Sequence, residues 1–412
     1  MRSGITEAWR FGTEGDFVDF RVYLLAATAF LAGVAETICV GILPEIAAGL
    51  QVSTAAAGQL TTIFSAVFAL AALAAVPFVA RTGRRLALFV SLATFAVANL
   101  IAAASPGYAS LFAARMLMAA SCATLILVAT RLAASLTAPE RRGRAIGIVF
   151  MGISGSLVLG VPIGMQIAQW WGWRAVFVAI ALPVLPMAVW LVRHLPRDVT
   201  TGRAAPDARV AWRAMLGERR LMAAQCVTIA MIGGHFTLFA YLAPYLQAVR
   251  APDPSTLAAL FVAFGVAGVG GAWLGGQSSD RLGAARALWC CPAVFICAMA
   301  VLPLVSANRF LFVPAMMLWA CISWSISPIV QSYLIRIAPE LADTTVGFNV
   351  SAMHMGVALG AAFGGLLVER GALRLTPWAG CALVAVALGC AGLAVRPKRG
   401  EQRSSAETHV SM

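Results

Sequence analysis

The chain has 412 residues, of which 61% are hydrophobic and only 11% are charged. Soluble domains carry about 25% charged residues, so this composition excludes an ordinary soluble enzyme or binding domain. The net charge is +13, from 30 basic residues. Most of these lie in short segments between apolar runs, so we expect them to set membrane topology and expect no nucleic-acid partner.

Apolar runs long enough to cross a bilayer recur along the chain and predict an all-α polytopic membrane protein. We expect twelve transmembrane helices, at residues 22–43, 55–79, 86–104, 109–136, 145–168, 173–192, 221–247, 256–276, 287–306, 310–336, 345–367 and 376–394. The predicted domains are an N-terminal tail (1–21), a six-helix bundle (22–192), an Arg- and Pro-rich linker (193–220), a second six-helix bundle (221–394) and a C-terminal tail (395–412).

The basic residues are distributed unevenly between the two ends of these helices. If the N-terminus is inside, 23 basic residues lie in inside segments and five lie in outside loops. This asymmetry predicts that both termini and the linker are cytoplasmic. The nine cysteines fall in or beside apolar runs without the spacing of a metal site, and we expect no metal or cofactor.

The two halves repeat at an offset of 200 residues. "ARTGR" at 80–84 corresponds to "DRLGA" at 280–284, and "APE" at 138–140 returns at 338–340. A series of small residues in the fifth span is also matched in the eleventh: Gly152, Ser156, Gly160 and Gly164 correspond to Ala352, Gly356, Gly360 and Gly364. A duplicated bundle is typical of transporters that alternate access between two halves.

The small residues of the fifth span recur every fourth position, so they share one helix face and allow another helix to approach closely. Pro162, between Gly160 and Gly164, removes one backbone hydrogen bond and favours a bend that could serve as a hinge. Plain helix packing is the alternative interpretation.

Two short loops carry a recognisable pattern. Arg81-x-Gly83-Arg84-Arg85 and its counterpart Asp280-Arg281-x-Gly283 resemble the loop signature of the major facilitator superfamily. Arg115 is similar to the fourth-helix arginine of that superfamily, and "LGVPIG" resembles the fifth-helix motif of its drug:proton antiporters.

The resemblance implies a fold of two pseudo-symmetric six-helix bundles in a bacterial inner membrane, with the loop residues controlling the conformational change. One departure is Ala80, where the superfamily usually has Asp, so the first loop is expected to hold the cytoplasmic side closed less firmly than the second, which keeps Asp280.

Several longer stretches resemble bacterial purine base and nucleoside efflux permeases. They are "GILPEIA", "APERRGRAIGIVFMGIS", "GGHFTLFAYLAPYL", "SWSISPIVQSYLIRIAPE" and "FNVSAMHMGVALGAAFGG". This resemblance implies a purine base or nucleoside as substrate. Related permeases for drugs, such as chloramphenicol, or for sugars share the same framework and give the alternative.

One carboxylate, Glu36, lies within the first apolar run. An ionised carboxylate at membrane depth costs a few kcal/mol unless it is paired. Arg115 lies at a similar depth in the fourth span, and the resemblance places both spans on one cavity. We therefore expect Glu36 and Arg115 to pair and Glu36 to carry the coupling proton. A purely structural ion pair is the alternative.

Aromatic and amide side chains of three spans are candidates for binding a flat heteroaromatic substrate. They are His235, Phe239, Tyr241, Trp324, Gln331, Asn349 and His354. For each histidine the alternative is a hydrogen-bonded packing residue, and His354 is also a second candidate for carrying the proton, as is His235.

The sequence as a whole predicts a proton-coupled antiporter that exports a small molecule and acts as a monomer in the lipid bilayer. A membrane enzyme is disfavoured because the chain shows no metal-ligand cluster, GxSxG motif or nucleotide loop. A non-transporting sensor would need an output domain, for which the linker and the tails are too short.

Overall fold

The structure is a computed structural model that describes residues 19–138, 141–195 and 208–396. In this part of the chain, 12 helices are long and apolar enough to cross a membrane, which confirms the predicted all-α fold.

The first half contains α1 (Phe20–Gly41), α2 (Leu43–Leu50), α3 (Thr54–Thr82), α4 (Arg84–Ala103), α5 (Tyr108–Ser135), α6 (Arg142–Gly155), the π-helix η2 (Ser156–Gly160), α7 (Val161–Trp171) and α8 (Trp173–His194). The second half contains α9 (Ala208–Gly217), α10 (Arg219–Phe239), α11 (Leu242–Arg250), α12 (Pro254–Arg281), α13 (Ala284–Leu304), α14 (Arg309–Ile337), α15 (Ala342–Glu369) and α16 (Thr376–Val395).

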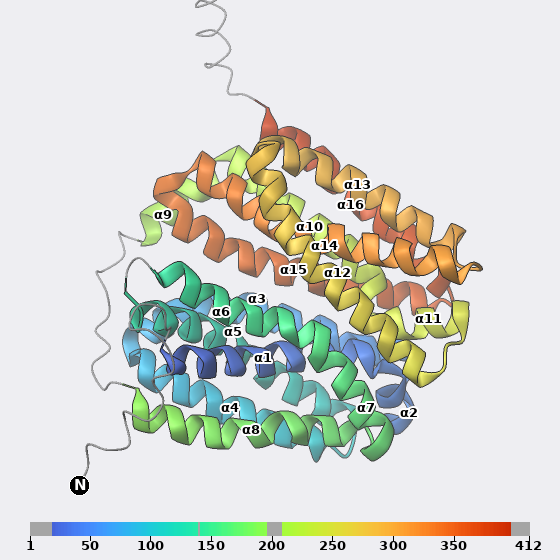
Figure 1. Cartoon of the computed structure of the whole chain (residues 1–412), viewed down its shortest axis with the longest axis horizontal. Coiled ribbons are helices and arrows are strands. Elements are labelled where there is room, and N and C mark those ends of the chain that lie inside the picture. Colours follow the sequence, from blue (N-terminus) through green and yellow to red (C-terminus); the bar gives the residue numbers. More distant parts are fainter. Residues whose placement is uncertain (1–18, 139–140, 196–207, 397–412) are drawn as a thin grey trace, which may run out of the picture.

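The two halves form two bundles that lie side by side (Figure 1). The principal contacts between them are made by α15 with α3, by α12 with η2 and α7, and by α11 with α1 and α2. We call the end of the bundles that carries α9 the linker end, and the end that carries α2 and α11 the far end. The contacts of α11 with α1 and α2 bring the bundles together at the far end.

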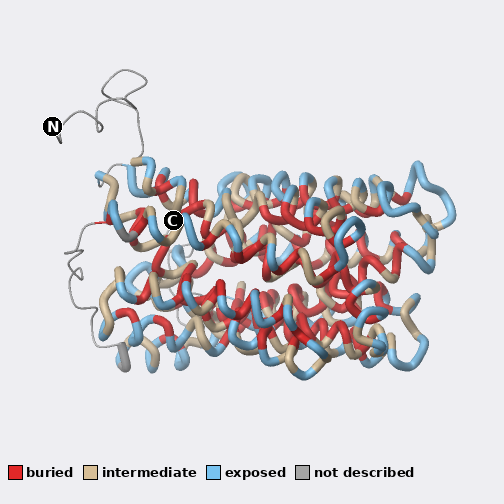
Figure 2. Tube along the Cα trace, turned by 90° about the horizontal axis from the view of Figure 1, so that it is seen from below, coloured by how far each residue is buried: buried red, intermediate tan, exposed pale blue. Residues whose placement is uncertain are grey.

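Buried residues follow the inner faces of the helices, and exposed residues lie on the periphery (Figure 2). Large apolar side chains occur in both places: Phe95 and Trp319 are buried, whereas Leu70 and Phe310 are exposed. An apolar periphery of this kind suits a protein that is surrounded by lipid.

Two of the predicted spans are interrupted near the far end. The first ends at Gly41 and is followed by α2, and the seventh, predicted as one span at 221–247, is divided between α10 and α11. Pro44 and Pro244, 200 residues apart, lie in the first turns of α2 and α11. Proline has no N–H to continue the preceding helix, so the chain turns at each of these two points.

The offset of 200 residues also relates contacts inside the bundles. Thr37 donates a hydrogen bond of 2.8 Å to the carbonyl of Gly33, and Thr237 donates one of 2.8 Å to the carbonyl of Gly233. The repeat predicted from the sequence is therefore repeated in side-chain geometry. Most of the N-terminal tail and of the C-terminal tail lies outside the described residues, as do residues 196–207 of the linker and residues 139–140 of the first "APE".

Candidate functional site between the bundles

Glu36 on α1 faces the opposite bundle. Its carboxylate Oε1 lies 3.2 Å from Nε2 of His354 on α15, and the side chains are 22% and 11% exposed. Since α1 and α15 belong to different bundles, this is a polar contact across the interface. It brings together two titratable groups that the sequence had assigned to different roles.

The His354 ring is held in place from two other sides. Its Nδ1 lies 2.9 Å from the carbonyl oxygen of Val350, and the ring stacks on Phe68 of α3 with centroids 3.6 Å apart. A carbonyl only accepts hydrogen bonds, so Nδ1 carries a proton. Nε2 is then a proton acceptor in the neutral ring and a donor in the charged ring. Nε2 of His354 and the carboxylate of Glu36 therefore face each other across the interface.

Arg115 is fully buried on α5, but it does not pair with the Glu36 carboxylate. Its guanidinium donates to the backbone carbonyl oxygens of Ala35 and Glu36 and lies 4.1 Å from the centre of the Phe64 ring. The predicted Glu36–Arg115 ion pair is therefore wrong in this conformation, because the arginine bonds to the α1 backbone and leaves the carboxylate to His354.

His235 lies inside the second bundle. It is 2% exposed, and its ring centroid lies 4.9 Å from that of Phe239 and 5.0 Å from that of Trp319. Neither ring nitrogen has a hydrogen-bond partner in the described part of the chain. In this conformation His235 and Phe239 are packed in an aromatic cluster.

Tyr241 joins the two bundles near the far end. Its hydroxyl donates a hydrogen bond of 3.1 Å to the carbonyl of Ala361, and its ring lies against Gly58 of α3. A Cβ added to Gly58 would lie 2.1 Å from the Tyr241 hydroxyl oxygen, so only glycine fits there without movement. This placement favours closure of the far end as the role of Tyr241.

Asn349 belongs to a buried polar network between α10 and α15. Its Nδ2 donates to Oε1 of Gln225 at 2.8 Å and to Oγ1 of Thr228 at 2.9 Å, and Gln225 donates to the carbonyl of Thr345. These contacts connect two helices of the same bundle. They favour a structural role over the predicted contact with a purine edge.

Trp324 lies where α14 approaches the first bundle. Its ring packs on Gly268 of α12, and it lines a small cavity together with Ser154 and Leu157 of the first bundle. Its indole Nε1 has no partner in the described residues. Gln331, seven residues later, is half-buried on the same face of α14. Trp324 therefore lies at the interface between the bundles, and substrate contact by Trp324 and Gln331 stays a prediction.

Hydroxyl groups on the helices that join the bundles add candidates that the sequence analysis missed. Thr61 and Ser65, one turn apart on α3, and Ser351 on α15 are buried, and their hydroxyls have no partner among the described residues. Single hydroxyls in apolar helices are common, so no sequence pattern distinguishes these three from the others.

The glycine face of the fifth span packs on α1. Added Cβ atoms would meet the Ala26 carbonyl oxygen at Gly152, Val34 at Gly160 and Ile38 at Gly164. The π-helix η2 ends at Gly160, two residues before Pro162, and it contacts α12 of the opposite bundle. The backbone is therefore irregular next to Pro162 and lies at the interface, whereas the predicted hinge role stays a prediction.

The two signature loops have the same backbone shape. Gly83 and Gly283 have φ of 81° and 82°, which glycine adopts without strain. Of the charged residues, Arg81 and Arg281 are exposed and Arg84 and Arg85 are half-buried. Asp280 pairs with Arg336 of its own bundle at 3.0 Å. This pair does not bridge the bundles in the present conformation.

Comparisons with known proteins agree with this architecture. The model of a family described as Major Facilitator Superfamily matches residues 25–353. The chain is 33% identical to an uncharacterized MFS-type transporter of Bacillus subtilis, with 90% of the chain and 94% of the relative covered. It is 32% identical to a chloramphenicol efflux pump of Mycobacterium tuberculosis, with 89% of each covered.

A solved structure is also similar in fold. It is a bacterial homolog of the human lysosomal transporter Spinster, in an inward-facing and unoccupied conformation. The TM-score is 0.77 at 16% identity, with 93% of this chain and 98% of the other covered.

Proposed function

Because the chain belongs to the Major Facilitator Superfamily, we propose that it is a proton-driven exporter of a small uncharged molecule that carries an aromatic ring. The observation that carries this proposal is the contact of 3.2 Å between Glu36 and His354. This contact supports the proposal, because relative movement of the two bundles would expose a titratable pair between them to either side of the membrane.

An antiporter needs a group whose protonation changes when the protein changes conformation, and this pair can supply it. While the bundles keep the present arrangement, Oε1 of Glu36 lies 3.2 Å from Nε2 of His354, at ion-pair distance but without a hydrogen bond. When the bundles move apart at this point, a charged group left without its partner is costly at membrane depth. Uptake or release of a proton then accompanies the conformational change. Arg115, bonded to the α1 backbone, fixes the position of Glu36.

Two substrate classes follow from different observations. The relative from Mycobacterium tuberculosis, which is named a chloramphenicol efflux pump, favours a chloramphenicol-like drug. The resemblance of several sequence stretches to purine permeases favours a purine base or nucleoside. The buried position of Asn349 in its own network weakens the case for the second class. Trp324 and the α3 hydroxyls suit either class.

The proposed location is the bacterial inner membrane, with the linker end in the cytoplasm. The concentration of basic residues in the linker and in the tails supports this orientation. In this orientation the far end, where α11 contacts α1 and α2, is periplasmic, and the conformation described here is closed on that side. We propose a monomer whose partners are its substrate, protons and the bilayer.

The direct test is transport by purified protein in liposomes. Labelled chloramphenicol, hypoxanthine and inosine are each supplied in counterflow, with empty liposomes as the control. We expect saturable exchange of chloramphenicol. Exchange of hypoxanthine alone would move the assignment to purines, and absence of exchange for all three would contradict the proposed substrate class.

A further inference from the structure

A cavity of about 430 Å³ opens at the linker end of the second bundle, where α10, α13, α14 and α16 meet. Its lining contains three arginines, Arg220, Arg286 and Arg336, and no acidic residue. The other lining residues are mainly small or apolar: Leu282, Gly283, Ala284, Ala285, Tyr333, Ile337, Ala394 and Val395. We call this the arginine cavity.

The three arginines are held differently. Arg336 pairs with Asp280 at 3.0 Å, and Arg220 donates from Nε to the carbonyl of Arg396 at 2.9 Å. Arg286 is exposed, and the described part of the chain gives it no partner. Three guanidinium groups and no carboxylate line the cavity, so an anion that enters it gains attraction.

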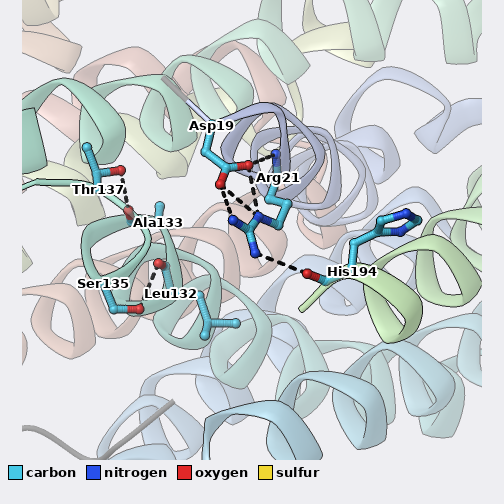
Figure 3. A network of polar contacts seen from close by, with 7 residues as sticks. All are labelled: Asp19, Arg21, Leu132, Ala133, Ser135, Thr137 and His194. Carbon is cyan, nitrogen blue, oxygen red and sulfur yellow. Dashed lines mark hydrogen bonds and ion pairs between the residues drawn. The ribbon is translucent and has the colours of Figure 1, made fainter. Parts of the chain in front are cut away.

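The linker end of the first bundle holds its arginine in a different way (Figure 3). There Arg21 is paired with Asp19 and donates to the carbonyl of His194 at 3.1 Å, as Arg220 does to Arg396. The His194 ring stacks on Trp190 with centroids 4.0 Å apart. Burial alone would raise the pKa of Asp19, but the hydrogen bonds and charge of Arg21 lower it, so Asp19 neutralises Arg21.

The loop that forms the floor of the cavity adds a further feature. Helix α13 starts after Gly283, and no side chain caps its first N–H groups. Ala284, Ala285 and Arg286, which carry these groups, all line the cavity. Unsatisfied N–H groups at a helix start attract negative charge and add to the effect of the arginines.

We propose that the arginine cavity binds the phosphate of an anionic phospholipid headgroup. Helix ends of this kind lie at the bilayer surface, where headgroup phosphates are concentrated. Guanidinium groups bind phosphate through paired hydrogen bonds, and basic pockets at the cytoplasmic ends of transmembrane helices suit anionic lipids. The apolar walls accommodate the glycerol and the first part of the acyl chains. Free phosphate shares the headgroup chemistry but has no acyl chain.

The test is native mass spectrometry of the full chain in detergent, titrated with phosphatidylglycerol, cardiolipin or phosphatidylethanolamine. The variants are Arg286→Gln and Arg286→Gln/Arg336→Gln. The matched control is Arg309→Gln, which changes an arginine in the first turn of α14 at the far end. In a second arm, inorganic phosphate at 10 mM competes with the lipid.

We expect anionic lipid to bind more tightly than phosphatidylethanolamine, by roughly ten-fold or more. We expect the single variant to weaken this binding several-fold and the double variant by a further several-fold, since each basic residue near the surface contributes separately. The control keeps wild-type binding. Equal binding of the neutral lipid, or unchanged binding in the double variant, overturns the proposal. Full displacement by inorganic phosphate assigns the cavity to free phosphate and overturns the lipid.

Discussion

Burying the Glu36 carboxylate at membrane depth costs free energy, and the neighbouring side chains show how this cost is reduced. A carboxylate within an apolar helix needs a partner or a proton. The adjacent guanidinium of Arg115 is occupied by carbonyl oxygens, whereas the imidazole of His354 comes from the other bundle. Glu36 therefore keeps this polar partner only while the bundles stay in this arrangement. A partner within the same bundle would stay in place when the bundles move.

Replacement of His354 by phenylalanine tests this dependence. His354→Phe preserves the stack on Phe68 but removes the nitrogen that faces Glu36. We expect gradient-driven transport to fall by about ten-fold or more, while substrate exchange without a gradient changes much less. Phe68→Leu is the matched control, because it removes the stack and keeps the nitrogen. Equal loss in both variants would show that the ring acts only through packing.

Asn349 gives a different expectation, since its amide nitrogen bonds within a buried network of the second bundle, while its Oδ1 has no partner among the described residues. Asn349→Ala removes both hydrogen bonds donated to Gln225 and Thr228 and leaves buried acceptors unpaired. The expected cost is about 1–3 kcal/mol of stability. It is measured as a lower unfolding temperature in detergent, with Gln331→Ala as a half-buried control. An unchanged unfolding temperature combined with altered substrate preference would return Asn349 to the binding site.

At the scale of helices, the interface between the bundles depends on small residues and on irregular backbone. The π-helix η2 contacts α12, and Gly265 of α12 lies so close that an added Cβ would be 2.9 Å from Cα of Val158. A π-helix has a wider turn than an α-helix and is often found at functional positions. Together with Pro162, it gives this helix a place to bend where the bundles meet.

Gly58 tests closure of the far end. Gly58→Ala puts a methyl group against the Tyr241 hydroxyl, so we expect α3 and α11 to move apart. Spin labels on Ala48 of α2 and Gln247 of α11, in a chain without other cysteines, should report a distance that is several ångströms longer. Gly270→Ala is the control, because an added Cβ there meets nothing within 4 Å. An unchanged distance would mean that Tyr241 does not hold this end closed.

The limits of the sequence prediction are physical. Length and hydropathy determine the spans, so all of them were predicted. The rotation of each helix about its axis was not predicted, because lipid and protein core are both apolar. The hydrophobic pattern therefore does not show which face of a helix is buried in the protein. His235 and Asn349 were therefore assigned to a cavity although they lie in packed interiors. The positions of Arg115 and Glu36 along their predicted spans put them at a similar depth in the membrane. Depth alone does not determine whether a guanidinium contacts a carboxylate or a backbone carbonyl.

For the whole molecule, orientation is a separate expectation. The basic residues predict a cytoplasmic linker. Ala205→Cys, in a background without reactive thiols, should resist an impermeant maleimide added to intact spheroplasts and react after the membrane is opened. A cysteine at Gln247, at the far end, should show the opposite behaviour. Rapid labelling of residue 205 from outside would reverse the orientation and the assignment of both ends.

The central claim is that Glu36 couples transport to protons. One pH unit supplies about 1.36 kcal/mol per proton, which is enough for roughly ten-fold accumulation at one proton per substrate. The most direct measurement is transport of labelled chloramphenicol in liposomes with an imposed pH gradient, for the wild type, Glu36→Gln and the control Glu45→Gln, an exposed acid on α2. We predict that the wild type and Glu45→Gln accumulate the drug against its concentration gradient and that Glu36→Gln only equilibrates it. Accumulation by Glu36→Gln at the wild-type level would contradict the account.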